Sequence, residues 1–153
     1  MVCLGNICRS PMAEGVLQQK LKEHNLENTV YVDSCGFDSY CLGNPPHYLS
    51  IQTAKNHGIN IENQRQRLFS TEDFDVFDKI YVMDNRNYQD VKRMARNAQD
   101  MNKVDFILNA VYPNKNQHVP DPYGGTEKSY EYAFQLINTA CEAIVEEVKR
   151  RDG

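Results

Sequence analysis

Apolar residues recur at helical spacing near the C-terminus of the chain. Between residues 130 and 148 they fall three or four positions apart, which places them on one face of a helix. This face contains Tyr130, Ala133, Phe134, Ile137, Cys141, Ile144, Val145 and Val148. Three basic residues, 149–151, follow it, and positive charge stabilises the C-terminal end of a helix. We therefore predict a long amphipathic helix in this region.

Three more helices are predicted closer to the N-terminus. The first follows Ser10, a good N-cap residue, and Pro11, which favours the first helical position. The second runs from about residue 49 to 57 and stops at Gly58. The third follows Asp84. The apolar positions behind the first and third helices are Ala13, Val16, Leu17 and Leu21, and Tyr88, Val91 and Met94.

Short runs typical of β-strands lie between the predicted helices, at residues 29–32, 79–83 and 103–108. Strands that alternate with helices predict βαβ units and a parallel sheet. Parallel sheets bind ligands at the carboxyl ends of their strands, so the loops at that edge are where we expect the chemistry. No internal repeat or linker is visible, and we predict one domain over residues 1–153.

Composition narrows the function classes. The chain has 153 residues and a net charge of −4, with no long basic run, so we predict no nucleic-acid partner. The longest apolar run, residues 80–83, is too short to cross a bilayer, and we predict no membrane partner. The five cysteines include no C-x-x-C pair, and the four histidines lack zinc-ligand spacing. Free thiols, no metal and a cytoplasmic monomer are the resulting expectations.

Residues 3–11, Cys-Leu-Gly-Asn-Ile-Cys-Arg-Ser-Pro, combine features that favour anion binding. Gly5 and Asn6 tolerate positive φ, so successive N–H groups of this loop can face inward as a nest. The predicted helix that follows adds its positive end to the same place. Arg9 offers a planar fork that matches two phosphate oxygens.

Cys3 lies at the start of this loop, where the thiolate form is favoured. A thiolate beneath a bound phosphate is a nucleophile for phosphoryl transfer. The six-residue step from Cys3 to Arg9 lets the intervening arc wrap one tetrahedral dianion. The alternative is a buried packing cysteine and a surface arginine, but Gly5, Asn6 and the Ser10-Pro11 helix start favour the functional interpretation.

The segment from Cys3 to Pro11 resembles the signature loop of the low-molecular-weight protein tyrosine phosphatases. The similarity extends over essentially the whole chain. Further matching positions are Met12–Glu14, Asp33-Ser34, Gly36, His57–Ile59, Arg65, Arg67, Phe77-Asp78, Met83-Asp84 and Pro120–Tyr123. The resemblance implies a three-layer α/β/α fold with a small parallel sheet, four-stranded in the family. It places the phosphate loop at the C-terminal edge of the strands, and it implies no cofactor.

The resemblance also implies an activity and roles for single residues. The expected reaction is hydrolysis of phosphotyrosine, in a protein or a small aryl phosphate, through a Cys3 phosphoenzyme. Asp121 would be the general acid and then the base, although an aspartate beside proline is also common in turns. The residues expected to bind phosphate are Leu4, Gly5, Asn6, Ile7, Cys8 and Arg9.

Other loop and rim positions have supporting roles under the same resemblance. Ser34 would help to pin Asn6 in a left-handed conformation. Ser10 would donate to the Cys3 thiolate, or act simply as the helix N-cap. Cys8 would be either a reversible redox partner of Cys3 or a packing residue. The walls around the substrate ring would be Ile7, Tyr40 and Tyr123.

Three departures from the family pattern stand out. Gly124 follows Tyr123 where the family often has a second aromatic residue, which removes one wall. His47-Tyr48-Leu49 replaces a frequent Asp-Pro-Arg, which changes the charge of that loop. Only Met1 and Val2 precede Cys3, whereas the family has a central strand there. We expect unpaired neighbouring segments and a groove at this place, and a chain that begins at an internal methionine or is truncated.

Three alternative functions remain. A non-catalytic phosphate-binding relic would fit the short start, but it would have no need to retain Asp121. Arginine phosphatases resemble the family but tend to have threonine where Ile7 stands, and an isoleucine suits a phenyl ring better. Arsenate reductases of this fold need extra redox cysteines, and residues 70–100 contain none.

Overall fold

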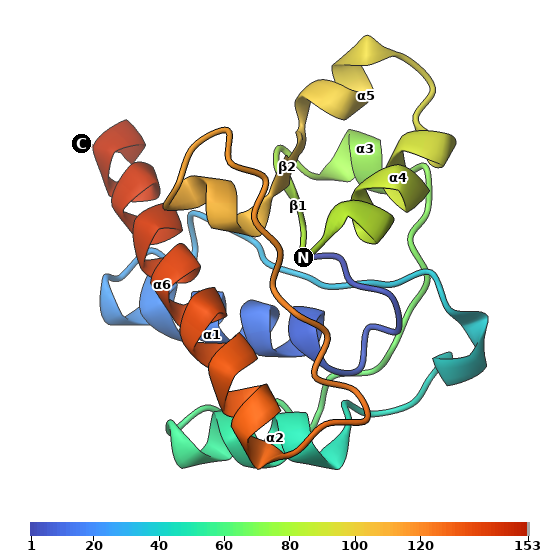
Figure 1. Ribbon diagram of the computed structural model, residues 1–153. Coiled ribbons are helices and arrows are strands. Elements are labelled where there is room, and N and C mark those ends of the chain that lie inside the picture. The colour runs from blue at the N-terminus through green and yellow to red at the C-terminus, as the bar shows by residue number, and fades with distance from the viewer. Residues whose placement is uncertain (153) are drawn as a thin grey trace.

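The sheet lies between two groups of helices in the computed structural model, which describes residues 1–152. β1 (Ile80–Val82) and β2 (Val104–Phe106) pair in parallel, with Ile80 opposite Val104. On one face lie α1 (Arg9–Glu23), α2 (Tyr48–Asn56) and α6 (Glu127–Asp152), which pack on one another (Figure 1). On the other lie α3 (Asp73–Val76), α4 (Asn85–Met94) and α5 (Ala98–Asn102). The predicted α/β class with a small parallel sheet is confirmed.

Single-residue bridges widen this sheet around the start of the chain. Val2 lies between Cys35 and Val82, in parallel with both, and Gly36 bridges to Leu68. The Val2 N–H donates to the Tyr81 carbonyl at 2.8 Å. The residues just before the predicted phosphate loop therefore lie at the centre of the sheet, which directs Cys3 to the edge where parallel sheets place their ligands.

Side chains alternate between two hydrophobic cores across the sheet. Ile80 and Val82 point into a core with Phe74 and Phe106, beneath α3 and α4. Tyr81, between them, packs against the opposite core, where α1 and α6 meet. Two short 3₁₀ helices, η1 (Ser39–Cys41) and η2 (Ile107–Ala110), complete the elements. Within the described residues, no helix has both the length and the hydropathy that crossing a bilayer requires.

The predicted helices are present, with one correction. α2, α4 and α6 lie where the apolar pattern placed them, and Gly58 beyond α2 has the positive φ of a helix stop, +78°. The prediction that Ser10 caps the first helix is wrong. α1 begins two residues earlier than predicted, at Arg9, with Cys8 at the cap position. The chain bends into helix directly from the loop, so the Ser10 hydroxyl is free to face Cys3.

The predicted strands are shorter than the sequence pattern indicated. β1 and β2 confirm the runs at 79–83 and 103–108, but residues from 107 onward turn into η2. The strand predicted at residues 29–32 is wrong, because that segment has no ladder partner. The first residue of this segment that pairs in the sheet is Cys35, which bridges to Val2. Its N–H donates to the Met1 carbonyl, and Met1 is the first residue of the central segment.

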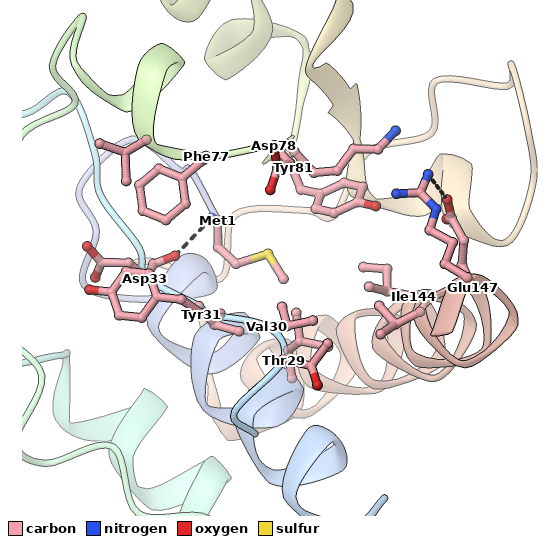
Figure 2. Close-up of a pocket in the computed structure, with 16 residues that line it drawn as sticks. Met1, Thr29, Val30, Tyr31, Asp33, Phe77, Asp78, Tyr81, Ile144 and Glu147 are labelled. Carbon is pink, nitrogen blue, oxygen red and sulfur yellow. Dashed lines mark hydrogen bonds and ion pairs between the residues drawn. The ribbon is translucent and has the colours of Figure 1, made fainter. Parts of the chain in front are cut away.

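A groove of about 360 Å³ lies beside Met1, between residues 29–33 and 76–81. Figure 2 shows the rings of Tyr31 and Phe77 at one end and Ile144 of α6 at the other. The Met1 ammonium group lies in this groove and donates to the Asp33 carbonyl at 3.0 Å. The groove expected at the start of the chain is thus present, and none of the predicted site residues lines it.

Candidate active site

The loop of residues 3–9 is held open by contacts to its carbonyl groups. The Leu4 carbonyl accepts from the Phe37 and Asp38 N–H groups, at 2.7 and 3.0 Å. The Ile7 carbonyl accepts from the His47 N–H at 2.7 Å, and Ser50 donates to the Cys8 carbonyl at 3.2 Å. Because these carbonyls are tied to the outside, the loop amides are left for the inner side, which is an anion-binding nest.

Asn6 organises the centre of the loop. Its φ of +53° is left-handed, a conformation that asparagine tolerates. Its side-chain amide donates to Ser10 Oγ at 2.8 Å and to Ser34 Oγ at 2.9 Å. Ser34 in turn donates to Glu14 Oε1 at 2.7 Å. Glu14 was not assigned a role from the sequence, because a surface-type residue in a helix gives no local signal of such a contact.

Cys3 lies at the bottom of this loop and is buried. Its Sγ is 3.2 Å from the Asn6 N–H and 3.1 Å from Ser10 Oγ. Since Ser10 Oγ already accepts from Asn6, its own hydrogen is available for the Cys3 sulfur. These two donors stabilise negative charge on Cys3.

Arg9 reaches the same place from the first turn of α1, with only 2% of its surface exposed. Its Nη1 donates to Asp84 Oδ2 at 2.7 Å and to the Val119 carbonyl at 2.8 Å. Its Nη2 is 3.7 Å from Asp121 Oδ2. Its Nε is buried and has no partner among residues 1–152. Burial alone would lower the pKa of Arg9, but the charges of Cys3, Asp84 and Asp121 raise it, so the cation is retained.

Asp84 is a site residue to which the sequence pattern gave no role beyond a helix start and a position that matches the family. It caps α4 in a capping box with Asn87, and it also holds Arg9. Burial would raise the pKa of Asp84, but the Asn87 N–H and the Arg9 guanidinium outweigh this and lower it. Its place directly after a predicted strand, at the ligand-binding edge of a parallel sheet, was the signal that could have identified it.

Asp121 comes to the loop from the segment between η2 and α6. The Val119 N–H donates to the Met83 carbonyl at 2.9 Å, which fixes this segment beside β1. Asp121 Oδ1 accepts from the Tyr123 N–H at 3.1 Å, and its side chain is 44% exposed. Cys3, Arg9 and Asp121 therefore converge from segments more than 100 positions apart.

The predicted wall residues lie at the mouth of the loop and are the least enclosed part of the site. Tyr123 is 64% exposed and meets the ring of His47 edge-on at 5.8 Å. Tyr40, on η1, is 93% exposed. Ile7 is partly buried and packs over Gly5. The structure thus brings Tyr123 and Ile7 to the rim, whereas Tyr40 stands out into solvent.

Comparison with known proteins identifies this arrangement. The family model for low molecular weight phosphotyrosine protein phosphatases matches residues 1–152. The chain belongs to this family. The chicken low molecular weight phosphotyrosine protein phosphatase is 38% identical over 145 residues, which cover 95% of this chain and 91% of that protein.

Solved structures of family members superpose closely on this phosphatase. A protein tyrosine phosphatase from Entamoeba histolytica, with Hepes in its active site, has a TM-score of 0.91 and 32% identity, and the match covers 99% of this chain and 96% of that one. The Drosophila arginine phosphatase has a TM-score of 0.88 and 32% identity, with 97% and 95% covered. Fold similarity therefore extends to proteins named for different phosphorylated residues.

Cys8 of this low molecular weight phosphatase is a buried thiol. Its Sγ is 3.4 Å from the Tyr130 hydroxyl. Burial raises the pKa of Cys8 to about 12, so the group is a neutral thiol at physiological pH. A neutral thiol attacks oxidised sulfur slowly, which favours the packing role. The pairing of Cys8 with Cys3 under oxidation stays a prediction.

Proposed function

We propose that this chain is a protein tyrosine phosphatase that hydrolyses phosphotyrosine through a phosphocysteine at Cys3. The observation that supports it most is the buried Arg9 Nε without a partner. A buried donor left unpaired is costly, and a phosphate oxygen above Cys3 would satisfy it. Nη2 would then take a second oxygen, which gives the planar two-point contact that arginine makes with phosphate.

In the first step, the phosphate dianion binds the loop amides, the N-terminal end of α1 and Arg9. The Cys3 thiolate attacks phosphorus, the sulfur–phosphorus bond forms, and the bond from phosphorus to the phenolic oxygen breaks. The Asp121 carboxylic acid gives its proton to the departing phenolic oxygen. The products of this step are the free phenol, the phosphocysteine and the Asp121 carboxylate.

In the second step, water attacks the phosphocysteine and the Asp121 carboxylate takes one of its protons. The sulfur–phosphorus bond breaks, and inorganic phosphate and the Cys3 thiolate are released. Ser10 and the Asn6 N–H, both within hydrogen-bond distance of the sulfur, stabilise the leaving thiolate. Asp121 ends protonated, ready for the next cycle.

The rim favours a phenyl ring over a guanidinium group. Ile7 presents an aliphatic surface next to the phosphate, and Tyr123 presents an aromatic ring. Apolar contact suits a planar phenol, whereas a guanidinium requires hydrogen-bond acceptors. A phosphoarginine peptide hydrolysed faster than the matching phosphotyrosine peptide would overturn this substrate assignment.

The reaction is tested by comparing leaving groups. Cys3→Ser should abolish hydrolysis of a phosphotyrosine peptide, whereas Cys41→Ser, outside the loop, should not. Asp121→Asn should lower kcat on the peptide by about 10²–10⁴-fold. The loss should be much smaller for an aryl phosphate whose leaving group is acidic and needs no proton. A folded chain that binds phosphate but turns over neither substrate would make it a binding protein instead.

We also propose a reducing, cytoplasmic location. The support is that the five cysteines are all unpaired in the described residues, and four of them are buried. Secreted proteins of this size usually pair their cysteines.

A further inference from the structure

His47, at the N-terminal end of α2, contacts both the phosphate loop and Tyr123 at the rim. Its backbone N–H donates to the Ile7 carbonyl of the phosphate loop at 2.7 Å. Its Nδ1 accepts from the Leu49 N–H at 3.1 Å, which caps α2. One residue therefore both begins this helix and ties it to the loop.

The ring of His47 contacts three tyrosines. It stacks on Tyr48 and Tyr130, with ring centroids 4.6 and 5.4 Å apart, and meets Tyr123 edge-on at an interplanar angle of 83°. Tyr130 is fully buried, and its hydroxyl contacts Cys8 of the loop. Tyr123 lies two positions after Asp121 and donates its N–H to that carboxylate. The imidazole is thus held in place by the loop and by α2, and the Tyr123 ring packs against it.

This arrangement requires the neutral imidazole. Nδ1 accepts a hydrogen bond, so the ring proton is on Nε2. Protonation of Nδ1 would remove the acceptor and put positive charge at a helix N-terminus, where it is unfavourable. Burial lowers the pKa of His47, in the same direction.

The groups that face the imidazole come from α2, from α6 and from the segment that follows Asp121. They are the phenol rings of Tyr48, Tyr130 and Tyr123. Behind Tyr130 lies the Cys8 thiol, and burial raises the pKa of both groups. Asp121, which accepts from the Tyr123 N–H, is the carboxyl group on the facing loop, and its ionised form would favour the protonated imidazole.

We propose that neutral His47 positions Tyr123, and through it the phenyl ring of an aryl phosphate, and that this selectivity is lost when the imidazole is protonated. His47 is a positioning residue, because it contacts the wall and the loop and not the reacting atoms. This role matters to the cell only if the proposed function is right. The role itself is recognition of the phenyl ring, which ligand binding measures without any turnover.

The test compares phenylphosphonate with methylphosphonate by calorimetry. The two probes share the phosphonate group, so the ratio of their Kd values, each corrected for the fraction of phosphonate dianion at that pH, isolates the contribution of the ring. In the unmodified protein, the preference for phenylphosphonate should fall by about fivefold from pH 7.5 to about pH 5, as histidine acquires its proton. A preference that does not change with pH would overturn the proposal, and this arm needs no variant.

Two variants separate the ring from the cap. His47→Asn retains an N-cap acceptor but has neither the ring nor a titrating group. It should show a low preference for phenylphosphonate that is the same at both pH values, with an unchanged Kd for methylphosphonate. His24→Asn, at the exposed C-terminal end of α1, should behave as the unmodified protein does. If His47→Asn retained the full preference at pH 7.5, the proposal would be wrong. Failure of turnover with intact phenylphosphonate selectivity would count against the proposed function and not against this inference.

Discussion

At the scale of single residues, Arg9 is held in place by groups of the protein itself. Asp84 and the Val119 carbonyl hold Nη1, which leaves Nε without a partner and Nη2 3.7 Å from Asp121 Oδ2. Donors fixed before the reaction cost no reorganisation when charge develops, and such preorganisation is the largest single contribution in many enzymes. The position of the arginine therefore depends on Asp84, which contacts no substrate itself.

Asp84→Asn tests this dependence. Asparagine caps a helix as well as aspartate does, so α4 should be retained. Arg9 would lose its buried counter-charge, and we expect the free energy of unfolding to fall by about 3 kcal/mol. We also expect kcat/KM for an aryl phosphate to fall at least tenfold, or about 1.4 kcal/mol. Asp90→Asn, which breaks an exposed pair with Arg93 on the same helix, should cost well under about 1 kcal/mol and leave kinetics unchanged.

Glu14 predicts a pH dependence of stability. Burial raises its pKa above the ordinary 4.5, and the hydrogen bond from Ser34 offsets this only in part. Between pH 4.5 and the raised pKa the native state binds more protons than the unfolded chain, so stability falls as pH rises through that window. Glu14→Gln removes the titration and retains an acceptor for Ser34. In urea unfolding, the free energy of unfolding of Glu14→Gln should rise relative to that of the unmodified protein from about pH 4 to about pH 7. Exposed Glu23→Gln should show no such trend, and an equal trend in both variants would refute the assignment.

At the scale of elements, the phosphate loop is shaped by the segment beside it. A Cβ at Gly36 would lie 2.7 Å from the Leu4 carbonyl oxygen and 2.8 Å from the Asn6 nitrogen. Both are backbone atoms of the loop, so neither can move aside without moving the nest. The bridge from Gly36 to Leu68 fixes the other side.

Gly36→Ala should therefore weaken phosphate binding directly, in addition to lowering the stability of the fold. We expect the Ki for inorganic phosphate to rise at least tenfold, with about 1–3 kcal/mol lost from stability. Gly15→Ala is the matched control, because its Cβ meets the Ile61 side chain, away from the loop. It should lower the melting temperature without changing that Ki. Unchanged phosphate inhibition in Gly36→Ala would show that the loop tolerates the shift.

The sequence was sufficient for elements whose signals are local. The loop of residues 3–11, the apolar face of α6 and the helix after Asp84 all follow from neighbouring residues. Asp84 and His47 were missed as site residues because their partners are Arg9, 75 positions away, and rings from three segments. The strand predicted at 29–32 failed because a ladder depends on a neighbour, and α3 and α5 are too short for periodicity to reveal.

At the scale of the whole molecule, the groove beside Met1 leaves backbone groups without partners. Within residues 1–152, the N–H groups of Tyr31, Val32 and Asp33 donate to nothing. The Met1 ammonium group already continues the ladder toward them. An extended segment joined to Met1 would run between residues 31–33 and 79–81 and cover the apolar floor of the groove.

We therefore predict that an N-terminal extension of five residues, alternating β-branched and polar, stabilises the protein. New ladder hydrogen bonds and apolar burial should add about 1–3 kcal/mol to the free energy of unfolding. Thermal and urea unfolding would measure it. A Gly-Ser extension of the same length is the control and should give little change. Equal effects from both extensions would mean that the groove does not accept a strand.

The order in which the chain is made bears on when the site can exist. Cys3 and its loop leave the ribosome before the rest of the site, and Asp84 and Val119, which hold Arg9, follow 75 and 110 positions after Arg9. Such distant contacts close late in folding. A fragment that ends before Val119 would contain the nucleophile, the nest and Asp84, but neither the Val119 carbonyl that also holds Arg9 nor the acid. Catalytic turnover of this chain is consequently a reporter of nearly complete synthesis and folding, and the early-made thiol is inactive until the last segments dock.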